Sequence, residues 1–140
     1  MVRILSILFL CVGLVSCATP YQSRGAMGGF TETQLGPDLY RVNFSGNGYT
    51  ANSTNRDYSI LRAAELGKDL GFPYFTLESD DHTRPVTNVV GTSFGATPIT
   101  KPESEILVKY HHRRPSQTVV YEPNFIIKSL RAKYKIQPKP

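Results

Sequence analysis

Residues 39–45 read Leu-Tyr-Arg-Val-Asn-Phe-Ser, and this stretch carries the clearest structural pattern of the chain. Tyr40, Val42 and Phe44 alternate with polar residues, so apolar side chains point to one face and polar side chains to the other. A period of two with aromatic and β-branched residues is typical of a half-buried β-strand. We therefore expect a sheet with one face packed against a core.

A second strand is predicted immediately before this one. Residues 31–35 are rich in β-forming side chains, and Gly36-Pro37-Asp38 between the two strands is a turn signal. The sequence Gly46-Asn47-Gly48 ends the later strand. Residues 31–45 are therefore expected to form a β-hairpin.

A helix is predicted after the hairpin. Ser53, Thr54 or Asn55 is expected to cap its start, and Asp57 is expected in the first turn, where negative charge suits the helix dipole. Gly71 is expected to end the helix in the left-handed conformation. Its apolar stripe contains small residues that allow close packing on a sheet, and consists of Ile60, Ala63, Ala64, Gly67 and Leu70.

The second half of the chain predicts three further strands and one long loop. Strand patterns cover residues 74–78, 105–111 and 118–121. Residues 79–102 show no periodicity and are dominated by Gly, Thr, Pro and Asn. A loop of this length inside a compact domain is either functional or disordered, and both alternatives stay open here.

A second helix is predicted to begin at Pro123, because proline suits the first helical position. Lys128, Arg131 and Lys135 share one face, which is our candidate interaction surface. The face expected to pack on the core consists of Phe125, Ile126, Ile127, Leu130 and Tyr134. The complete order is β-β-α-β-loop-β-β-α, which predicts a single α+β domain with both helices on one face of an antiparallel-containing sheet.

The N-terminus has the pattern of a bacterial lipoprotein signal peptide. One basic residue, Arg3, precedes an apolar run of roughly 12 residues, which is shorter than the ~20 that a membrane-spanning helix needs. Leu14-Val15-Ser16-Cys17 matches the lipobox, so residues 1–16 are expected to be removed and Cys17 to receive lipid. Two or three acyl chains hold a protein on a membrane where one does not. The alternative is an ordinary cleaved signal peptide.

We predict three segments in this chain: the signal peptide, a lipidated tether at residues 17–28, and the α+β domain at residues 29–137. Cysteine usage supports the lipid, because Cys11 leaves with the signal peptide and no other thiol remains beside Cys17. In such lipoproteins, Asp directly after the lipidated Cys favours the inner membrane. Ala18 stands here, which implies the outer membrane facing the periplasm, with the inner membrane as the alternative.

The chain resembles a group of small proteobacterial lipoproteins of unknown function. The resemblance covers about 50 residues and the lipobox. It is carried by Gly28-Gly29-Phe30-Thr31-Glu32-Thr33-Gln34-Leu35, by residues 40–50, which read YRVNFSGNGYT, and by Leu61-Arg62-Ala63-Ala64-Glu65-Leu66. It implies a periplasm-facing lipoprotein and brings no activity, cofactor or catalytic residue.

Charge is unevenly placed along the chain. Residues 17–100 hold 6 basic and 8 acidic side chains, whereas residues 101–140 hold 9 basic and 3 acidic ones. A basic C-terminal third beside a membrane suggests an acidic envelope protein or polymer, or anionic lipid headgroups, as partner. The alternative is a solvated helix face, and nucleic acid is not expected. Arg62 and Glu65, one helical turn apart, are expected to pair on the surface.

The sequence carries no strong catalytic or metal-binding motif. Residues 80–82 (Asp-Asp-His) and the adjacent His111 and His112 lack a spacing that would join them as metal ligands. Ser93 lies in Gly91-Thr92-Ser93-Phe94-Gly95, where the glycines have the separation of a G-x-S-x-G motif, but this segment is not expected to form the strand-to-helix turn that the motif requires. We therefore expect no enzyme, metal or cofactor, and a noncatalytic envelope binding or structural protein. A small-ligand or metal binder, or an enzyme acting on the envelope, is the alternative.

Overall fold

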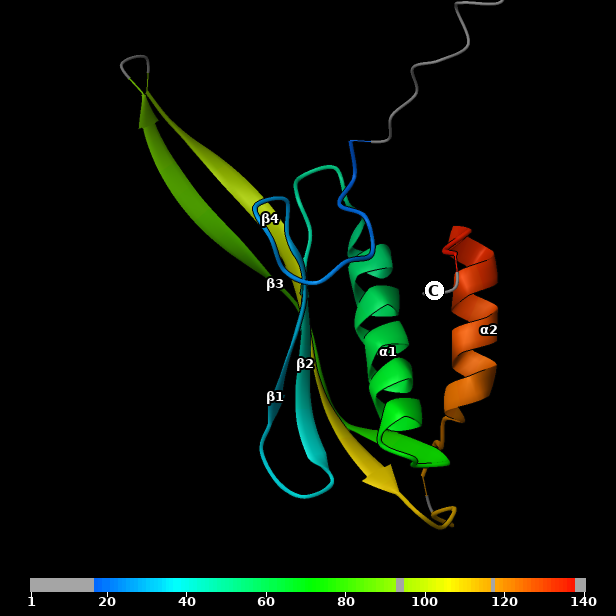
Figure 1. Ribbon diagram of the computed structural model, residues 1–140. Helices are drawn as coiled ribbons and strands as arrows, with labels where there is room; N and C mark the ends of the chain where they lie inside the picture. Colours follow the sequence, from blue (N-terminus) through cyan, green and yellow to red (C-terminus); the bar gives the residue numbers. More distant parts are fainter. Residues whose placement is uncertain (1–16, 93–94, 117, 138–140) are drawn as a thin grey trace, which may run out of the picture.

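The computed structural model describes residues 17–92, 95–116 and 118–137, and describes only the backbone over residues 79–102. The element order is β1 (Gly29–Gln34), β2 (Leu39–Ser45), α1 (Asn52–Asp69), β3 (Tyr74–Thr92), β4 (Gly95–His111) and α2 (Pro123–Tyr134). The strands form one antiparallel sheet in the order β1-β2-β4-β3. Helix α1 lies against this sheet and α2 lies beside α1 on the same side (Figure 1). The predicted α+β class is confirmed.

The core forms where the alternating residues of β2 meet α1. Val42 pairs with Ile106 of β4 in the sheet register, and both side chains are fully buried. Burying an aliphatic or aromatic side chain of this kind contributes about 1.5–3 kcal/mol. The core cluster consists of Tyr40, Val42, Ile60, Ala63, Ala64, Phe75, Ile106, Val108 and Tyr110. The hairpin predicted around residues 36–38 and the apolar face of residues 39–45 are both confirmed.

The small residues of α1 let the helix approach the sheet closely. Ala63 and Ala64 are fully buried, and a Cβ placed on Gly67 would lie 2.7 Å from Cε1 of Tyr110. The Tyr110 hydroxyl donates a 2.7 Å hydrogen bond to the Ala63 carbonyl, which satisfies a buried polar group. Leu70, the last residue of the predicted stripe, is 43% exposed, so the stripe ends one turn earlier than expected.

The helix-capping prediction for α1 is wrong, whereas the predicted C-terminal stop is right. The helix begins at Asn52, and its N-cap Ala51 makes no side-chain cap hydrogen bond. Asp57 lies beyond the first turn, where its carboxylate accepts hydrogen bonds from Lys133 and Tyr134 of α2. Gly71 adopts φ +80°, the left-handed conformation that was expected at the end of this helix.

The long loop predicted at residues 79–102 is instead part of a β-hairpin. Strands β3 and β4 remain paired out to Thr92 and Gly95, and this arm projects beyond the rest of the sheet (Figure 1). Register shifts between Leu77 and Ser79, and between Asp81 and Arg84, interrupt the pairing. These irregularities break the period of two at residues 77–84. From Pro85 and Pro102 outward the pairing is regular, but the sequence there does not alternate between apolar and polar residues.

The segment before α2 contains a single β-bridge rather than the strand predicted at residues 118–121. Phe75 and Tyr121 exchange two backbone hydrogen bonds of 3.0 and 2.9 Å, while Val119 is 70% exposed. Pro123 occupies the start of α2 as predicted. Phe125 is 68% exposed and does not face the core; the partly buried residues that pack there from α2 are Ile126, Ile127 and Leu130.

Candidate functional site

Cys17, the predicted lipidation site, is exposed and lies directly before the folded domain. Its carbonyl oxygen accepts a 2.5 Å hydrogen bond from the side-chain amide of Asn47, in the loop between β2 and α1. The backbone at Cys17 is therefore attached to the domain. The Cys17 side chain therefore lies at the surface of the described structure.

Thr19, only two residues later, is a buried part of the domain. It is 2% exposed, its N–H donates to Thr50 Oγ1 (3.0 Å), and its hydroxyl donates to the Met27 carbonyl (2.8 Å). The same hydroxyl accepts a hydrogen bond from the backbone N–H of Asn47 (2.8 Å). The interpretation of residues 17–28 as a tether is therefore wrong from Thr19 onward. A polar composition suggested solvent exposure, but the buried polar groups have partners within the fold.

Tyr21 fastens the same N-terminal segment to α1. Its ring packs against Phe30 and Tyr58, with centroids 5.0 and 5.4 Å away. Its hydroxyl donates a 2.5 Å hydrogen bond to Oε2 of Glu65. Burial raises the pKa of Tyr21 well above its ordinary value, and the hydrogen bond to Glu65 raises the pKa further. The hydroxyl thus stays protonated and remains a donor across the physiological pH range.

Glu65 is the centre of a partly buried ion-pair network. The predicted pair with Arg62 is present at 3.7 Å, and the side chains of Arg62 and Glu65 are 17% and 13% exposed. Arg131 of α2 donates to Oε1 of Glu65 from Nε (3.2 Å) and Nη2 (2.7 Å), and Arg62 pairs with Glu32 of β1 at 2.7 Å. The network therefore joins the N-terminal segment, β1, α1 and α2, which the sequence spacing alone did not reveal.

The three basic residues of the candidate interaction surface do not share one exposed face. Lys128 and Lys135 are exposed, but the guanidinium of Arg131 turns toward α1 and Glu65. Spacings of three and four residues placed all three on one stripe, yet the long arginine side chain reaches across to the neighbouring helix. Lys135 follows α2 with φ 53°, and the N–H of the next residue, Ile136, bonds to the Arg131 carbonyl at 3.0 Å.

The adjacent residues His111 and His112 contact different parts of the domain. His111 Nε2 lies 2.9 Å from Thr76 Oγ1, whereas the ring of His112 packs on Phe72 at a centroid distance of 4.5 Å. Within residues whose side chains are described, no three His, Cys, Asp or Glu residues are grouped to hold a metal ion. The acidic residues and histidine at positions 80–82, and Ser93, lie outside that part of the structure.

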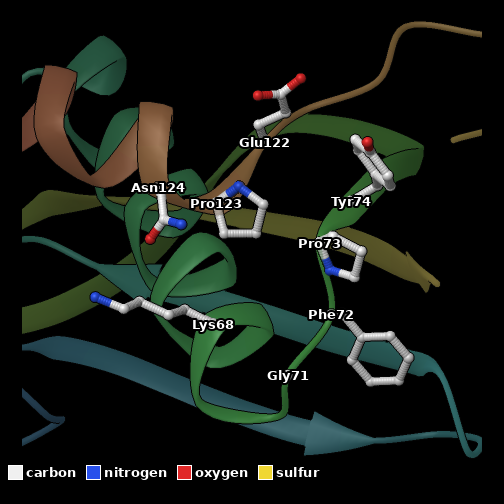
Figure 2. Close-up of a pocket in the computed structure, with 8 residues that line it drawn as sticks. All are labelled: Lys68, Gly71, Phe72, Pro73, Tyr74, Glu122, Pro123 and Asn124. Atoms are coloured by element: carbon white, nitrogen blue, oxygen red, sulfur yellow. The ribbon is translucent and has the colours of Figure 1, made fainter. Parts of the chain in front are cut away.

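A surface pocket of about 400 Å³ lies at the other end of α1, where α2 begins. Figure 2 shows Pro73 and Pro123 in its middle, with Lys68 on one side and Phe72 and Tyr74 on the other. Gly71, Glu122 and Asn124 complete the lining. A second hollow of about 650 Å³ shares Phe72 and includes His111, His112 and Arg113. This end of the molecule therefore offers concave surface with mixed apolar and charged character.

The fold defines the chain as a small α+β protein with helices on one face of an antiparallel sheet. Comparison with family models, curated proteins and solved structures gives no match. Within residues 17–92, 95–116 and 118–137, no helix combines the length and apolar content needed to cross a membrane.

Proposed function

We propose that this protein is a lipoprotein held to the outer membrane by lipid on Cys17, with its domain facing the periplasm. The lipobox Leu14-Val15-Ser16-Cys17 supports the lipid, and Ala18 after the cysteine supports outer-membrane sorting. The observation that carries the proposal is the position of Cys17, which is exposed two residues before the buried Thr19. Because the Cys17 thiol is exposed, lipid attached to it would not disturb the packing of the domain. The resemblance to small proteobacterial lipoproteins supports the same assignment.

The domain itself acts, in this proposal, as a noncatalytic binding or structural module of the envelope. The charged side chains nearest the core, Glu65, Arg62 and Arg131, are engaged with one another and hold elements together. Their arrangement supports a stabilising role rather than a chemical one. Contacts with a partner are then made by exposed side chains. The first candidates are Lys128 of α2 and Lys135 at the C-terminal end of this helix.

Removing the charges of Lys128 and Lys135 should weaken binding to an acidic surface. We expect the double variant Lys128→Gln, Lys135→Gln to bind vesicles containing anionic phospholipid up to about 30-fold less well at low salt, because each basic residue near such a surface contributes about 1 kcal/mol. Flotation of the unlipidated Cys17→Ser chain measures this. Arg131 is left unchanged because it pairs with Glu65.

The matched control for that experiment is Lys68→Gln, Lys109→Gln. It removes the same charge from side chains at other places on the domain: Lys68 is exposed beside the pocket, and Lys109 is 44% exposed on β4. Equal losses for the two double variants would show a net-charge effect only. Binding that does not change in either variant at low salt would remove α2 as an acidic-partner surface.

The pocket beside Phe72 supports a second candidate function, which is binding of a small ligand. Its volume of about 400 Å³ falls within the range of small-molecule sites. Its polar lining groups Lys68, Glu122 and Asn124 are all exposed, whereas ligand sites usually combine an apolar wall with polar groups held in place. This candidate therefore ranks second.

The lipid is tested by the intact mass of the protein extracted from membranes. We expect a mature chain that begins at Cys17 and carries added diacylglyceryl and acyl mass, and a Cys17→Ser variant that lacks this mass. A soluble chain that begins at Ala18 or later would overturn the anchor. The remaining proposal would then be a diffusible binding protein.

A further inference from the structure

We propose that this protein forms a homodimer in which the hairpin arm of one copy pairs edge to edge with the arm of a second copy. The arm consists of residues 85–92 of β3 and residues 95–102 of β4, which pair without interruption. In the dimer the outer edges of the two β3 strands run antiparallel, and the two arms together form a four-stranded sheet. This inference goes beyond the proposed envelope function and does not depend on lipid at Cys17.

The arm is a two-stranded ribbon that leaves the rest of the sheet. Strand β2 accompanies β4 only as far as Ser45, which pairs with Glu103. Beyond that point residues 95–102 extend the ribbon by about 26 Å, at ~3.3 Å per residue (Figure 1). An isolated two-stranded ribbon is at best marginally stable in water, whereas a sheet of three or more strands can be stable. Pairing with further strands would therefore stabilise the arm.

The prolines of the arm determine where its backbone groups point. Pro85 is the partner of Pro102, and because neither has an N–H they cannot exchange hydrogen bonds. Antiparallel pairs alternate between those whose N–H and C=O groups point at each other and those whose groups point outward, so this pair is of the outward kind. Every second pair from there is outward as well. The outward positions are Pro85, Thr87, Val89 and Gly91 on β3, and Ala96, Pro98, Thr100 and Pro102 on β4.

Proline leaves only one edge of the arm open. On β4 two of the four outward positions are proline, which cannot donate to a neighbouring strand. On β3 the one outward proline, Pro85, lies at the base of the arm. Three successive outward positions beyond it therefore offer both N–H and C=O to a further strand: Thr87, Val89 and Gly91.

This open edge lies on the side of the arm away from β2. The strand order is β1-β2-β4-β3, so β3 is the last strand of the sheet. Among the described residues, the outer edge of β3 is bridged at Phe75, by Tyr121, at the other end of the strand. A further strand can therefore pair with residues 85–92 without displacing one that is already there.

The open edge is complementary to itself. When Val89 lies opposite Val89 of the second copy, antiparallel pairing places Thr87 of each copy opposite Gly91 of the other. Each of the three outward positions then meets a position that also offers N–H and C=O. No other two-fold register pairs all three, so a second copy satisfies the whole open edge.

The charge distribution also favours a second copy. Residues 85–100 contain no Asp, Glu, Lys, Arg or His, so two identical arms meet without like charges, and no charge protects the edge from pairing. Elsewhere two copies repel, because residues 17–140 hold 15 basic and 11 acidic side chains. Val89 pairs with Pro98, five positions from Glu103, so the two Glu103 residues of the dimer lie about 33 Å apart along the strands. This separation exceeds the Debye length of about 10 Å, and salt therefore screens the repulsion.

A lipid bilayer does not satisfy the same edge. An uncharged ribbon is compatible with an apolar surrounding, but hydrocarbon offers no partner for the outward N–H and C=O groups. Open sheet edges exposed to lipid do not occur in the hydrocarbon region for this reason. A paired strand supplies the missing hydrogen bonds.

The central position of the open edge allows a direct test in the mature Cys17→Ser chain. Because the N–H of Val89 points outward, Val89→Pro removes no hydrogen bond within the arm. We expect sedimentation equilibrium over a range of concentrations to show a dimer, with a dissociation constant at least about tenfold higher in Val89→Pro, which lacks two hydrogen bonds at the interface. The matched control is Thr100→Pro, which places proline at an outward position of the β4 edge and should leave the dissociation constant unchanged.

Cross-linking tests the register independently of the proline variant. The Cys17→Ser chain has no other thiol in residues 17–140, so Val89→Cys introduces a single one. In the proposed dimer the two Cα atoms at this position lie about 5.5 Å apart, and a short bismaleimide should link the copies. Thr100→Cys is the control, because two β3 strands, and thus more than ~14 Å, separate its two copies.

Three results would overturn the proposal. One is a chain that is monomeric at every concentration, whether or not it binds vesicles or other proteins. Another is a dimer that both proline variants weaken equally, or that neither weakens. The third is a Val89→Cys chain that cross-links no better than Thr100→Cys, which decides the matter even if circular dichroism shows that Val89→Pro does not fold. The intact mass tests the lipid anchor separately, so either proposal can fail alone.

Discussion

Replacing Glu65 with alanine is expected to lower the free energy of unfolding by about 2–4 kcal/mol. The substitution leaves Arg62 and Arg131 without their shared carboxylate and leaves the Tyr21 hydroxyl without its acceptor. Removing one member of a partly buried network leaves the charges of the other members without a partner, which costs more free energy than losing an exposed ion pair. Urea denaturation followed by circular dichroism measures the change.

Two controls distinguish the network from a general effect on α1. Glu65→Gln keeps one acceptor oxygen but replaces the other with an NH2 donor and loses the charge, so its stability should fall between those of Glu65→Ala and the unchanged chain. Asp69→Ala removes an exposed acid from the last turn of the same helix, and such surface changes usually stay within about 0.5 kcal/mol. If Glu65→Ala were no more destabilising than Asp69→Ala, the network would not hold the domain together.

Replacing Gly29 with alanine is expected to undock the N-terminal segment and destabilise the protein by about 3 kcal/mol. Gly29 has φ +133°, a conformation that side chains with a Cβ rarely adopt. A Cβ there would lie 2.5 Å from the carbonyl oxygen of Gln22 and 2.6 Å from that of Ser23. Both obstacles are backbone atoms, so relief requires the whole segment to move.

Limited trypsin digestion reports this undocking. The exposed Arg24 lies in the segment, and its backbone N–H bonds to the Phe30 carbonyl, which protects the chain from cleavage. Cleavage after Arg24 should be much faster in Gly29→Ala and is followed by the mass of the fragment. The matched control is Gly25→Ala, where a Cβ would meet nothing within 4 Å. Equal cleavage rates in the two variants would show that Gly29 is not needed for docking.

The local sequence pattern was sufficient to predict those elements whose apolar periodicity shows which side chains are buried. The alternation of Tyr40, Val42 and Phe44 predicted β2 with its correct bounds, because a half-buried strand exposes every second side chain. The helical spacing of Ala63, Ala64 and Gly67 likewise predicted the buried face of α1. Gly71 marked where that helix stops, since glycine adopts a left-handed conformation without steric strain. The signal peptide and Cys17 remain predictions from sequence.

Features that depend on contacts between distant residues came only from the tertiary structure. Thr19 is buried because Thr50 and Asn47, about 30 residues later, satisfy its polar groups. Arg131 leaves the exposed face of α2 because Glu65 is within reach on α1. Sequence periodicity records which face of an element is apolar, but not which distant polar group will meet a given side chain. The same reason applies to the arm of β3 and β4, where residues 85–92 pair regularly with residues 95–102 although neither sequence alternates between apolar and polar residues.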